Sequence, residues 1–303
     1  MRVLLTGATG FLGSYVADEL LTSGHSVAAL IRQGSNPWRL RPILDRLAVI
    51  EGSFANLRKI EPALSAFKPE AVAHLAWEGV AGAVRNDPAQ AQNIVHTVAL
   101  AELAADVGAR VWIGAGSQAE YGAYDRPINE DDATHPTTLY GWAKLAAGKM
   151  AQQICVAREI RFAWLRVFST YGPMDAEHWL IPSTIRSLQG GERVPLTAGE
   201  QRWGFLHARD AATAFRTALL HPDARGVLNV GSPEAPRLRN TLEELRDFVN
   251  PQADLGFGDI AYRPDQVMVL QADVTRLSRL GWRPKVSLAE GLRETTAWYA
   301  QRS

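Results

Sequence analysis

The strongest constraint on the fold is an alternation of short apolar runs with helical segments in the first half of the chain. The apolar runs are three to six residues long and cover residues 3–5, 27–31, 47–50, 71–75, 111–113 and 162–167. The three- and four-residue spacing of apolar positions that indicates helices is found in residues 11–22, 56–67, 88–107 and 140–157. Strands that alternate with helices form a parallel sheet covered on both faces. We therefore expect an α/β protein built on a doubly wound parallel sheet.

The alternation loosens after Tyr171-Gly172-Pro173, where glycines and prolines separate shorter elements. A chain of 303 residues suits one large domain with a smaller lobe. We expect residues 1–166 to form the sheet domain and residues 167–303 to form a smaller α/β lobe on its C-terminal side. Residues 202–231 again have a strand–helix–strand pattern, so we expect them to rejoin the sheet domain.

A glycine-rich segment, residues 6–13, joins the first expected strand to the first expected helix. Gly7 permits a tight turn, Gly10 lets the backbone approach a diphosphate, and Gly13 allows close packing of helix on sheet. The helix N-terminus then favours the negative charge of the phosphates. The alternative is a purely structural turn, but this strand–loop–helix context is what a Rossmann-type dinucleotide site requires. The candidate cofactor-binding residues here are Gly7, Thr9, Gly10, Phe11, Leu12 and Gly13.

The end of the second expected strand bears on the choice of cofactor. A site that prefers NAD usually has Asp or Glu here to hold the ribose 2′-hydroxyl. This chain has Ile31 followed by Arg32. Because a guanidinium pairs well with a phosphate, we expect NADP (NADPH) as the cofactor, with Arg32 on its 2′-phosphate. The alternative is a solvated arginine at a strand end.

Tyr140 and Lys144 lie four residues apart, and therefore on one face of an expected helix. Free tyrosine has a pKa of about 10 and is a poor base at neutral pH, but a nearby ammonium group stabilises the phenolate. Such a tyrosine can exchange a proton with a carbinol oxygen. Ser117, after the fifth expected strand, can bond the same oxygen. The spacing alone occurs by chance in many helices, so the order of these features along the chain carries the inference.

With these features in this order, the chain resembles the extended short-chain dehydrogenases/reductases, which include nucleotide-sugar epimerases, dehydratases and reductases. The resemblance covers nearly the whole chain. It implies that Ser117 polarises the substrate oxygen, that Tyr140 is the acid/base, and that Lys144 also binds the nicotinamide ribose. Further matching features are His74-Leu75-Ala76, Asn93 with Thr97, Tyr121-Gly122, Arg166, Tyr171-Gly172-Pro173, Gly199 with Gln201, Asp210, Asn229 and Gly281-Trp282. Cofactor contacts are also implied for Ser53, Phe54, Leu75, Ala76 and Asn93.

Two departures from the family pattern bear on the cofactor and the reaction. The third expected strand leads into Ser53, where an acidic residue commonly contacts adenine, so we expect a weaker contact. Ser117-Gln118-Ala119 stands where dehydratases of the family usually have Thr-Asp-Glu. Without that acid pair the elimination of water lacks its usual acid and base. We therefore do not expect a 4,6-dehydratase.

The substrate side of the chain departs further from the family. Ser169 stands where Asn is frequent, and Trp203 stands where a diphosphate-binding arginine is usual. Arg202 is adjacent to Trp203, but neighbouring strand residues point to opposite faces. Arg263 precedes Asp273 at the interval that the family usually has for a second phosphate-binding arginine. The substrate-binding candidates are Trp77, Ser169, Arg202, Trp203 and Arg263. For each arginine the alternative is a solvated surface position, and for each tryptophan it is packing.

Composition argues against several other functions. Lys and Arg together number 32, as do Asp and Glu, so nothing indicates binding to nucleic acid or to an anionic membrane. With a single cysteine, Cys155, and no His-x-x-x-His pair, we expect no metal site. No apolar run approaches the roughly 18 residues of a membrane span, and no leader precedes the first strand. We therefore expect a cytoplasmic protein.

These features together favour an NADPH-dependent reductase that converts a nucleotide-linked 4-keto-6-deoxyhexose to a 6-deoxyhexose. The alternative enzyme is a nucleotide-sugar C4-epimerase, which uses the same residues and holds its cofactor tightly. A remote alternative is a non-catalytic NADP-binding regulatory protein, although such proteins typically lose the tyrosine or the lysine that this chain retains.

The helices expected at residues 88–107 and 140–157 carry small or apolar residues on more than one side. A helix that is apolar nearly all round is buried on both sides, and the matching helices of the family commonly form a dimer interface. We therefore expect a homodimer. The residues concerned include Val95, Val98, Ala99, Ala147, Ala151 and Ile154.

Overall fold

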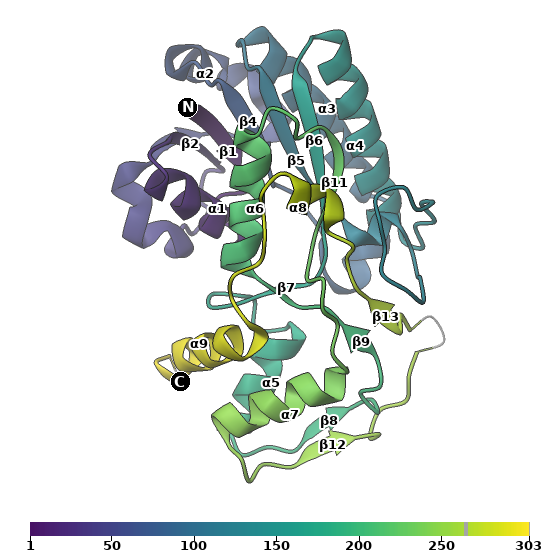
Figure 1. Cartoon of the computed structure of the whole chain (residues 1–303). Helices are drawn as coiled ribbons and strands as arrows, with labels where there is room; N and C mark the ends of the chain where they lie inside the picture. Colours follow the sequence, from purple (N-terminus) through teal and green to yellow (C-terminus); the bar gives the residue numbers. More distant parts are fainter. Residues whose placement is uncertain (264–265, 303) are drawn as a thin grey trace.

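The structure, a computed structural model, describes residues 1–263 and 266–302. Its central feature is a seven-stranded parallel sheet with the strand order β11-β6-β5-β4-β1-β2-β3 (Figure 1). The strands are β1 (Arg2–Thr6), β2 (Ser26–Ile31), β3 (Ala48–Glu51), β4 (Ala71–His74), β5 (Val111–Ser117), β6 (Arg161–Val167) and β11 (Gly226–Val230). The first six have the order 3-2-1-4-5-6 of a Rossmann fold, which confirms the expected fold class. β11 extends the sheet by pairing in parallel with β6.

The sheet is buried on both faces because each strand sends alternate side chains to opposite sides. On β1, Val3 and Leu5 face one layer of helices and Leu4 faces the other, and all three are fully buried. One layer contains α1 (Phe11–Thr22) and α6 (Ala208–Leu220), and the other contains α2 (Glu61–Phe67), α3 (Gln90–Asp106) and α4 (Leu139–Ala157). Burying a side chain of leucine size contributes roughly 1.5–3 kcal/mol, so these two cores hold the sheet together.

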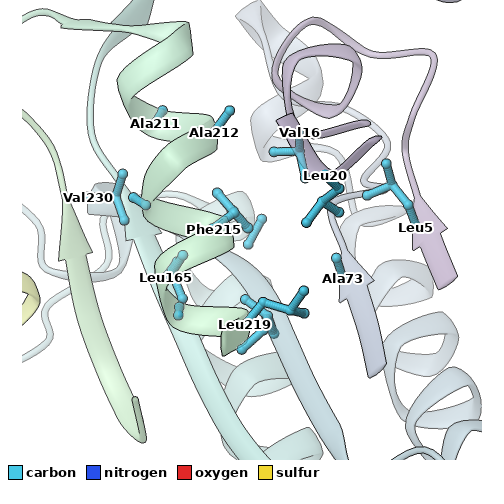
Figure 2. Close-up of a cluster of buried hydrophobic side chains, with 14 of the residues drawn as sticks. Leu5, Val16, Leu20, Ala73, Leu165, Ala211, Ala212, Phe215, Leu219 and Val230 are labelled. Atoms are coloured by element: carbon cyan, nitrogen blue, oxygen red, sulfur yellow. The ribbon is translucent and has the colours of Figure 1, made fainter. Parts of the chain in front are cut away.

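The core under α1 and α6 joins segments that lie far apart in the sequence. Figure 2 shows side chains of the two helices over the sheet, with Val16 and Leu20 from α1, Phe215 and Leu219 from α6, and Leu5, Ala73, Leu165 and Val230 from the strands. α6 and β11 follow β6 in the chain after the first strands of the C-terminal region. The chain beyond residue 167 therefore supplies one helix and one edge strand to the sheet.

The other region lies beyond the carboxyl ends of β6 and β11, at one end of the sheet (Figure 1). Its helices are α5 (Leu180–Gln189), α7 (Leu238–Val249) and α9 (Leu288–Ala300), which share a separate core that includes Ile185, Leu242 and Leu292. Its parallel strand pairs are β7 (Thr170–Tyr171) with β10 (Leu206–His207), β8 (Val194–Leu196) with β12 (Leu255–Phe257), and β9 (Arg202–Trp203) with β13 (Val269–Leu270). We call these helices and strand pairs the C-terminal lobe. The short helix α8 (Thr275–Arg279) returns to β11 of the sheet.

Short 3₁₀ segments follow four strands of the sheet. They are η1 (Trp38–Arg46) after β2, η2 (Phe54–Lys59) after β3, η3 (Gly82–Asn86) after β4 and η4 (Gln118–Glu120) after β5. The helix expected at residues 56–67 is therefore wrong in its first part. Asn56 has φ −148° and ψ 68°, which breaks the helical turn, and α2 begins only at Glu61.

β5 is longer than the apolar run at residues 111–113 predicted, and its extra residues reach the carboxyl edge of the sheet. A Cβ on Gly114 would lie 2.3 Å from the Trp164 ring, so glycine here lets the indole of β6 pack against β5. The strand continues in register with β6 as far as Ser117. Ser117 is therefore held by the sheet itself rather than by a loop after it.

The outer faces of α3 and α4 are partly apolar. Val95 of α3 and Trp142, Met150 and Val156 of α4 are each 48–64% exposed. Val98, Ala99 and Ile154 are half-buried. Ala147 and Ala151, which were expected on this outer face, lie instead in the core against the sheet. Their four-residue spacing places them on the same stripe of α4 as the buried Ala143 and Cys155.

Two kinds of feature are not found in the part of the chain that the structure describes. None of its helices is long and apolar enough to span a membrane. Nor do three His, Cys, Asp or Glu side chains gather closely enough in residues 1–263 and 266–302 to hold a metal ion.

Candidate active site

Gly7 makes the turn between β1 and α1. Its φ is +75°, and a Cβ there would lie 2.6 Å from the backbone nitrogen of Ala76. Only glycine fits this conformation and this space, so the loop after β1 lies directly against the loop after β4. The Gly10 N–H closes the turn by donating to the Gly7 carbonyl (3.0 Å). Gly13 packs on the same turn, because a Cβ there would lie 2.0 Å from the Gly7 carbonyl oxygen.

A chain of buried hydrogen bonds ties these two loops to α3. The Thr97 hydroxyl donates to the Asn93 carbonyl (2.8 Å), so its oxygen accepts from Nε2 of His74 (3.1 Å). Nδ1 of His74 is then left to accept from the Thr6 hydroxyl (2.7 Å), which accepts in turn from the Ala76 N–H (3.2 Å). Burial lowers the pKa of His74 to about 3, so the ring is neutral, as this network requires.

Asn93 reaches the same region by a different route. Its Oδ1 accepts the Glu78 N–H (3.0 Å), and its Nδ2 donates to the Glu78 carbonyl (3.1 Å). This two-way bond fixes the loop after β4, which carries Trp77. The role of Asn93 in this structure is thus to hold that loop beside the site.

These loops border a cavity of about 190 Å³. Most of the candidate cofactor residues line it, namely Gly7, Thr9, Gly10, Arg32, Ser53, Phe54, Leu75, Ala76 and Asn93. Phe11, Leu12 and Gly13 form the first turn of α1, which has neither a side-chain cap nor an acidic residue there. The glycine turn and the uncapped helix N-terminus fit the diphosphate of a dinucleotide. Phe54, whose ring stacks on His96, offers the adenine base of such a dinucleotide a flat apolar surface.

Arg32 lines this cavity, but it has a partner that the sequence did not indicate. Its guanidinium forms an ion pair with Glu78, and the two side chains are 64% and 67% exposed. An exposed pair of this kind contributes about 0–1 kcal/mol. Arg32 is therefore held only weakly and can exchange the carboxylate for another anion.

Ser117, Tyr140 and Lys144 come together at the carboxyl edge of the sheet, and each is more than nine-tenths buried. The start of α4 brings this about. Thr138 caps the helix, since its hydroxyl oxygen accepts the Gly141 N–H (3.1 Å). A Cβ on Gly141 would lie 2.5 Å from the Ala119 carbonyl oxygen. Glycine beside Tyr140 thus lets α4 lie against η4, directly after Ser117.

The side chains of the trio contact the end of β5, the start of η4 and the Trp77 ring. Nζ of Lys144 donates to the Ala115 carbonyl (2.7 Å) and lies 3.8 Å from the centre of the Trp77 ring. Trp77 meets the Tyr140 ring edge-on, with 6.1 Å between ring centroids. The Ser117 hydroxyl oxygen accepts the Ala119 N–H (3.2 Å), so its own proton remains available to Tyr140 or to a substrate oxygen.

Burial controls the titration of the trio. It raises the pKa of Tyr140, although a hydrogen bond with Ser117 and the charge of Arg85 both act in the opposite direction. Burial also lowers the pKa of Lys144 to about 7, and the Glu120 carboxylate opposes this shift. The Tyr140 hydroxyl is therefore protonated at neutral pH and can donate its proton.

Glu120 does not replace the acid pair that dehydratases carry in this segment. It is fully buried, and its Oε1 accepts from the Ser117 N–H (2.8 Å) and the Trp164 Nε1–H (2.9 Å). Its Oε2 accepts from Nε of Arg166 (2.7 Å). Because three donors surround this buried carboxylate, it cannot take a proton from a substrate. Glu120 instead fixes the backbone of Ser117.

The candidate substrate residues fall into separate groups. Trp77 contacts the trio, whereas Trp203 and Ser169 meet in the C-terminal lobe, where Nε1 of Trp203 donates to Oγ of Ser169 (2.7 Å). Arg202 is exposed, and its Nε donates to the Ala235 carbonyl (3.2 Å). Arg263 is exposed as well. The structure therefore does not bring Arg202 to the Ser169–Trp203 pair.

Three residues near the site were not among the sequence candidates. Glu78 lies in the loop after β4 and Arg85 in the short 3₁₀ segment η3 that follows it, and no periodic sequence pattern predicts the path of either. Glu120 lies between Ser117 and the family motif Tyr121-Gly122, and a charged residue in that apolar stretch was a signal that could have been used. Arg85 lies over the ring of Tyr140.

Comparison with known proteins identifies the family of the chain. Residues 3–231 match the NAD dependent epimerase/dehydratase family. The dTDP-6-deoxy-L-talose 4-dehydrogenase (NAD(+)) of Aggregatibacter actinomycetemcomitans is 26% identical over 81% of this chain and 89% of its own length. The GDP-6-deoxy-D-mannose reductase of Pseudomonas aeruginosa is 26% identical over 96% of this chain and 95% of its own. The UDP-glucose 4-epimerase of Thermotoga maritima superposes with a TM-score of 0.90 at 24% identity, covering 100% and 99% of the two chains. The chain belongs to the NAD dependent epimerase/dehydratase family and is an enzyme of the extended short-chain dehydrogenase/reductase type.

Proposed function

We propose that this enzyme reduces the keto group of a nucleotide-linked 4-keto-6-deoxyhexose with NADPH. The observation that carries the proposal is the meeting of Ser117 and Tyr140 at the sheet edge, beside the cavity that fits a dinucleotide. When bound, the nicotinamide cofactor supplies the hydride to the carbonyl carbon. The protein's own task is then to supply a proton to the carbonyl oxygen.

The buried tyrosine is suited to this task. Tyr140 is protonated at neutral pH, so its hydroxyl donates a proton to the oxygen as negative charge develops there. The Ser117 hydroxyl donates a hydrogen bond to the same oxygen and lowers its negative charge. Lys144 holds the end of β5 by donating to the Ala115 carbonyl, and its ammonium group would bind the nicotinamide ribose of the cofactor.

The names of the relatives support the substrate class. Two of them act on a nucleotide-linked 6-deoxyhexose, one as a 4-dehydrogenase and one as a reductase. The Glu120 geometry argues against dehydration, because this carboxylate beside Ser117 is already bound by three donors. The alternative function is a nucleotide-sugar 4-epimerase, which the fold similarity to the Thermotoga enzyme favours.

The choice of NADPH over NADH rests on Arg32. It lines the cavity at the end of β2, where a 2′-phosphate of the adenine ribose would lie. Its only ion pair among the described residues, with Glu78, is exposed and weak. A doubly charged phosphate can therefore displace that carboxylate.

One purification distinguishes the two enzyme functions. The protein is purified without added cofactor, denatured, and the released nucleotide is identified by chromatography. An empty site, together with NADPH oxidation by a nucleotide-linked 4-keto-6-deoxyhexose, supports the reductase. Stoichiometric bound NAD, with interconversion of 4-hydroxy epimers and no net NADPH oxidation, would instead establish the epimerase. NADPH binding with no turnover of any nucleotide-linked sugar tested would favour a non-catalytic regulator.

We also propose that the enzyme is a homodimer that pairs through the outer faces of α3 and α4. Val95, Trp142, Met150 and Val156 expose apolar surface there, and a large contiguous apolar patch on a protein surface indicates an interface. Light scattering should give twice the chain mass, and Trp142→Glu should reduce it to one chain. A monomer mass in the wild type across the micromolar range would contradict the proposal.

A further inference from the structure

Arg85 of η3 lies over the face of the Tyr140 ring. The central carbon of its guanidinium is 4.7 Å from the ring centroid, within the range of a cation–π contact. Trp77 meets the same ring edge-on from another side. The phenol ring is thus held between a cation and an indole.

The Arg85 side chain has little else to bind. Its Nε is buried and has no hydrogen-bond partner, and no carboxylate of the described chain pairs with the guanidinium. A buried donor without a partner costs about 1–3 kcal/mol. The positive charge of Arg85 is therefore directed to the ring of Tyr140 rather than neutralised by an acid.

The segment that carries Arg85 is fixed at both ends. After it, Oδ1 of Asn86 accepts the Leu139 N–H at the start of α4 (3.1 Å). Before it, Nε2 of Gln90 donates to the carbonyls of Gly79 (2.6 Å) and Val84 (3.1 Å). η3 is therefore anchored to the same helix turn that places Tyr140, and the stacking is not that of a free surface arginine.

The groups that face Tyr140 come from four elements. Lys144 of α4 is 5.9 Å from the ring centroid and donates to Ala115, so Arg85 is the closer cation. Ser117 of β5 is a hydrogen-bond partner, and Glu120 of η4 is the nearby negative charge. Arg85 and Ser117 lower the pKa of Tyr140, whereas burial and Glu120 raise it.

From this geometry we propose that Arg85 is a positioning residue of the catalytic centre, a second cation that orients the Tyr140 ring and stabilises its ionised form. The inference rests on the proposed role of Tyr140 as the acid/base. When Tyr140 gives its proton to the substrate oxygen, the phenolate that remains lies under the guanidinium. Lys144 also stabilises this phenolate, from the side on which the cofactor would bind.

The test is a titration of Tyr140 that needs no substrate. Tyrosinate absorbance is read directly after a rapid pH jump, and the Tyr140→Phe signal is subtracted to isolate Tyr140. A cation at this distance lowers an acid's pKa by about one unit or more, so Arg85→Met should raise the Tyr140 midpoint by about one unit. Arg85→Lys, which keeps the charge, should restore most of the shift. Arg110→Met, an exposed arginine before the amino end of β5, is the matched control and should leave the midpoint unchanged.

Turnover gives a second readout. Arg85→Met should lower kcat severalfold and move the pH profile in the direction of the titration, with cofactor affinity unchanged. An unchanged Tyr140 midpoint in a folded Arg85→Met protein would overturn the proposal. An increase in KM for the sugar alone, with the midpoint unchanged, would show that Arg85 binds an anionic substrate group instead. If the midpoint shifts but no sugar is turned over, the inference about Arg85 stands and the proposed function fails.

Discussion

The two sides of the site are built in different ways. On the cofactor side, backbone turns make the surface, and the buried chain from Thr6 through His74 to Thr97 locks the loops together. On the proposed substrate side, single side chains from distant segments make the surface, as in the bond from Trp203 of β9 to Ser169. The cofactor side tolerates little change, because a Cβ at Gly7 would collide with backbone. The substrate side can change by one side chain at a time.

This difference has a physical origin. A turn with positive φ and a close backbone approach is satisfied by glycine alone, so its sequence is specific and local. A pocket wall made of side chains is satisfied by any residues that fill the space and pair their polar atoms. We propose that the catalytic residues Ser117, Tyr140 and Lys144 act where the two sides meet, so the largest effects of substitution are expected there.

The largest effect should come from Tyr140→Phe, which removes only the hydroxyl between the two sides. General acid–base catalysis contributes about 10²–10⁴-fold, so single-turnover NADPH oxidation should fall by that factor while cofactor affinity stays the same. Lys144→Met should lower turnover and also weaken cofactor binding, because we propose that the lysine also binds the nicotinamide ribose. Turnover of Tyr140→Phe within about threefold of wild type would disprove the assigned mechanism.

Acid stability should report on the buried chain of the cofactor side. The pKa of His74 lies well below that of a histidine in the unfolded chain, so the unfolded state binds its proton first. The contribution of His74 to the free energy of unfolding is therefore fully present above about pH 6.5. It is lost as the pH falls toward 3, by up to about 1.4 kcal/mol per pH unit. Denaturant titrations of His74→Gln should show a shallower acid limb than wild type. The exposed His135→Gln is the control, and an equal change in both variants would contradict the prediction.

Cofactor preference should respond to Arg32 and Glu78 in opposite directions. A hydrogen bond to a charged group is worth about 1.5–3 kcal/mol, so Arg32→Ala should remove roughly ten- to a hundredfold of the preference for NADPH over NADH. Glu78→Gln should tighten NADPH binding by up to about fivefold, because it removes the competing carboxylate. Titration calorimetry with both cofactors checks this. Equal affinities in the wild type would remove the basis for NADP.

The smallest effect is expected on the substrate side. Ser169→Ala removes the acceptor of the Trp203 indole, and a neutral hydrogen bond is worth about 0.5–1.5 kcal/mol. KM for the sugar should rise by about two- to tenfold, while NADPH affinity changes little. The comparison between the two sides would break down if Ser169→Ala weakened NADPH binding as strongly as Arg32→Ala.

Expectations from the sequence held best where one short segment decides its own structure. The strand–helix alternation predicted the doubly wound sheet, and the order of Ser117, Tyr140 and Lys144 predicted the family. Expectations failed at positions whose structure depends on contacts with other parts of the chain. Asn56 breaks an expected helix, and Ala147 and Ala151 lie on the sheet rather than on the outer face of α4.

The fold class and the family could be predicted from the residues alone, because hydrophobic periodicity and glycine turns are local properties of the chain. The contacts around the trio and around Arg32 depend instead on how the folded chain packs. Arg85 on Tyr140, Glu78 on Arg32 and Glu120 under Ser117 are contacts made where the loops after separate strands converge at one edge of a parallel sheet. Periodic sequence patterns do not predict where these loops meet, because the path of an irregular loop depends on the residues packed around it.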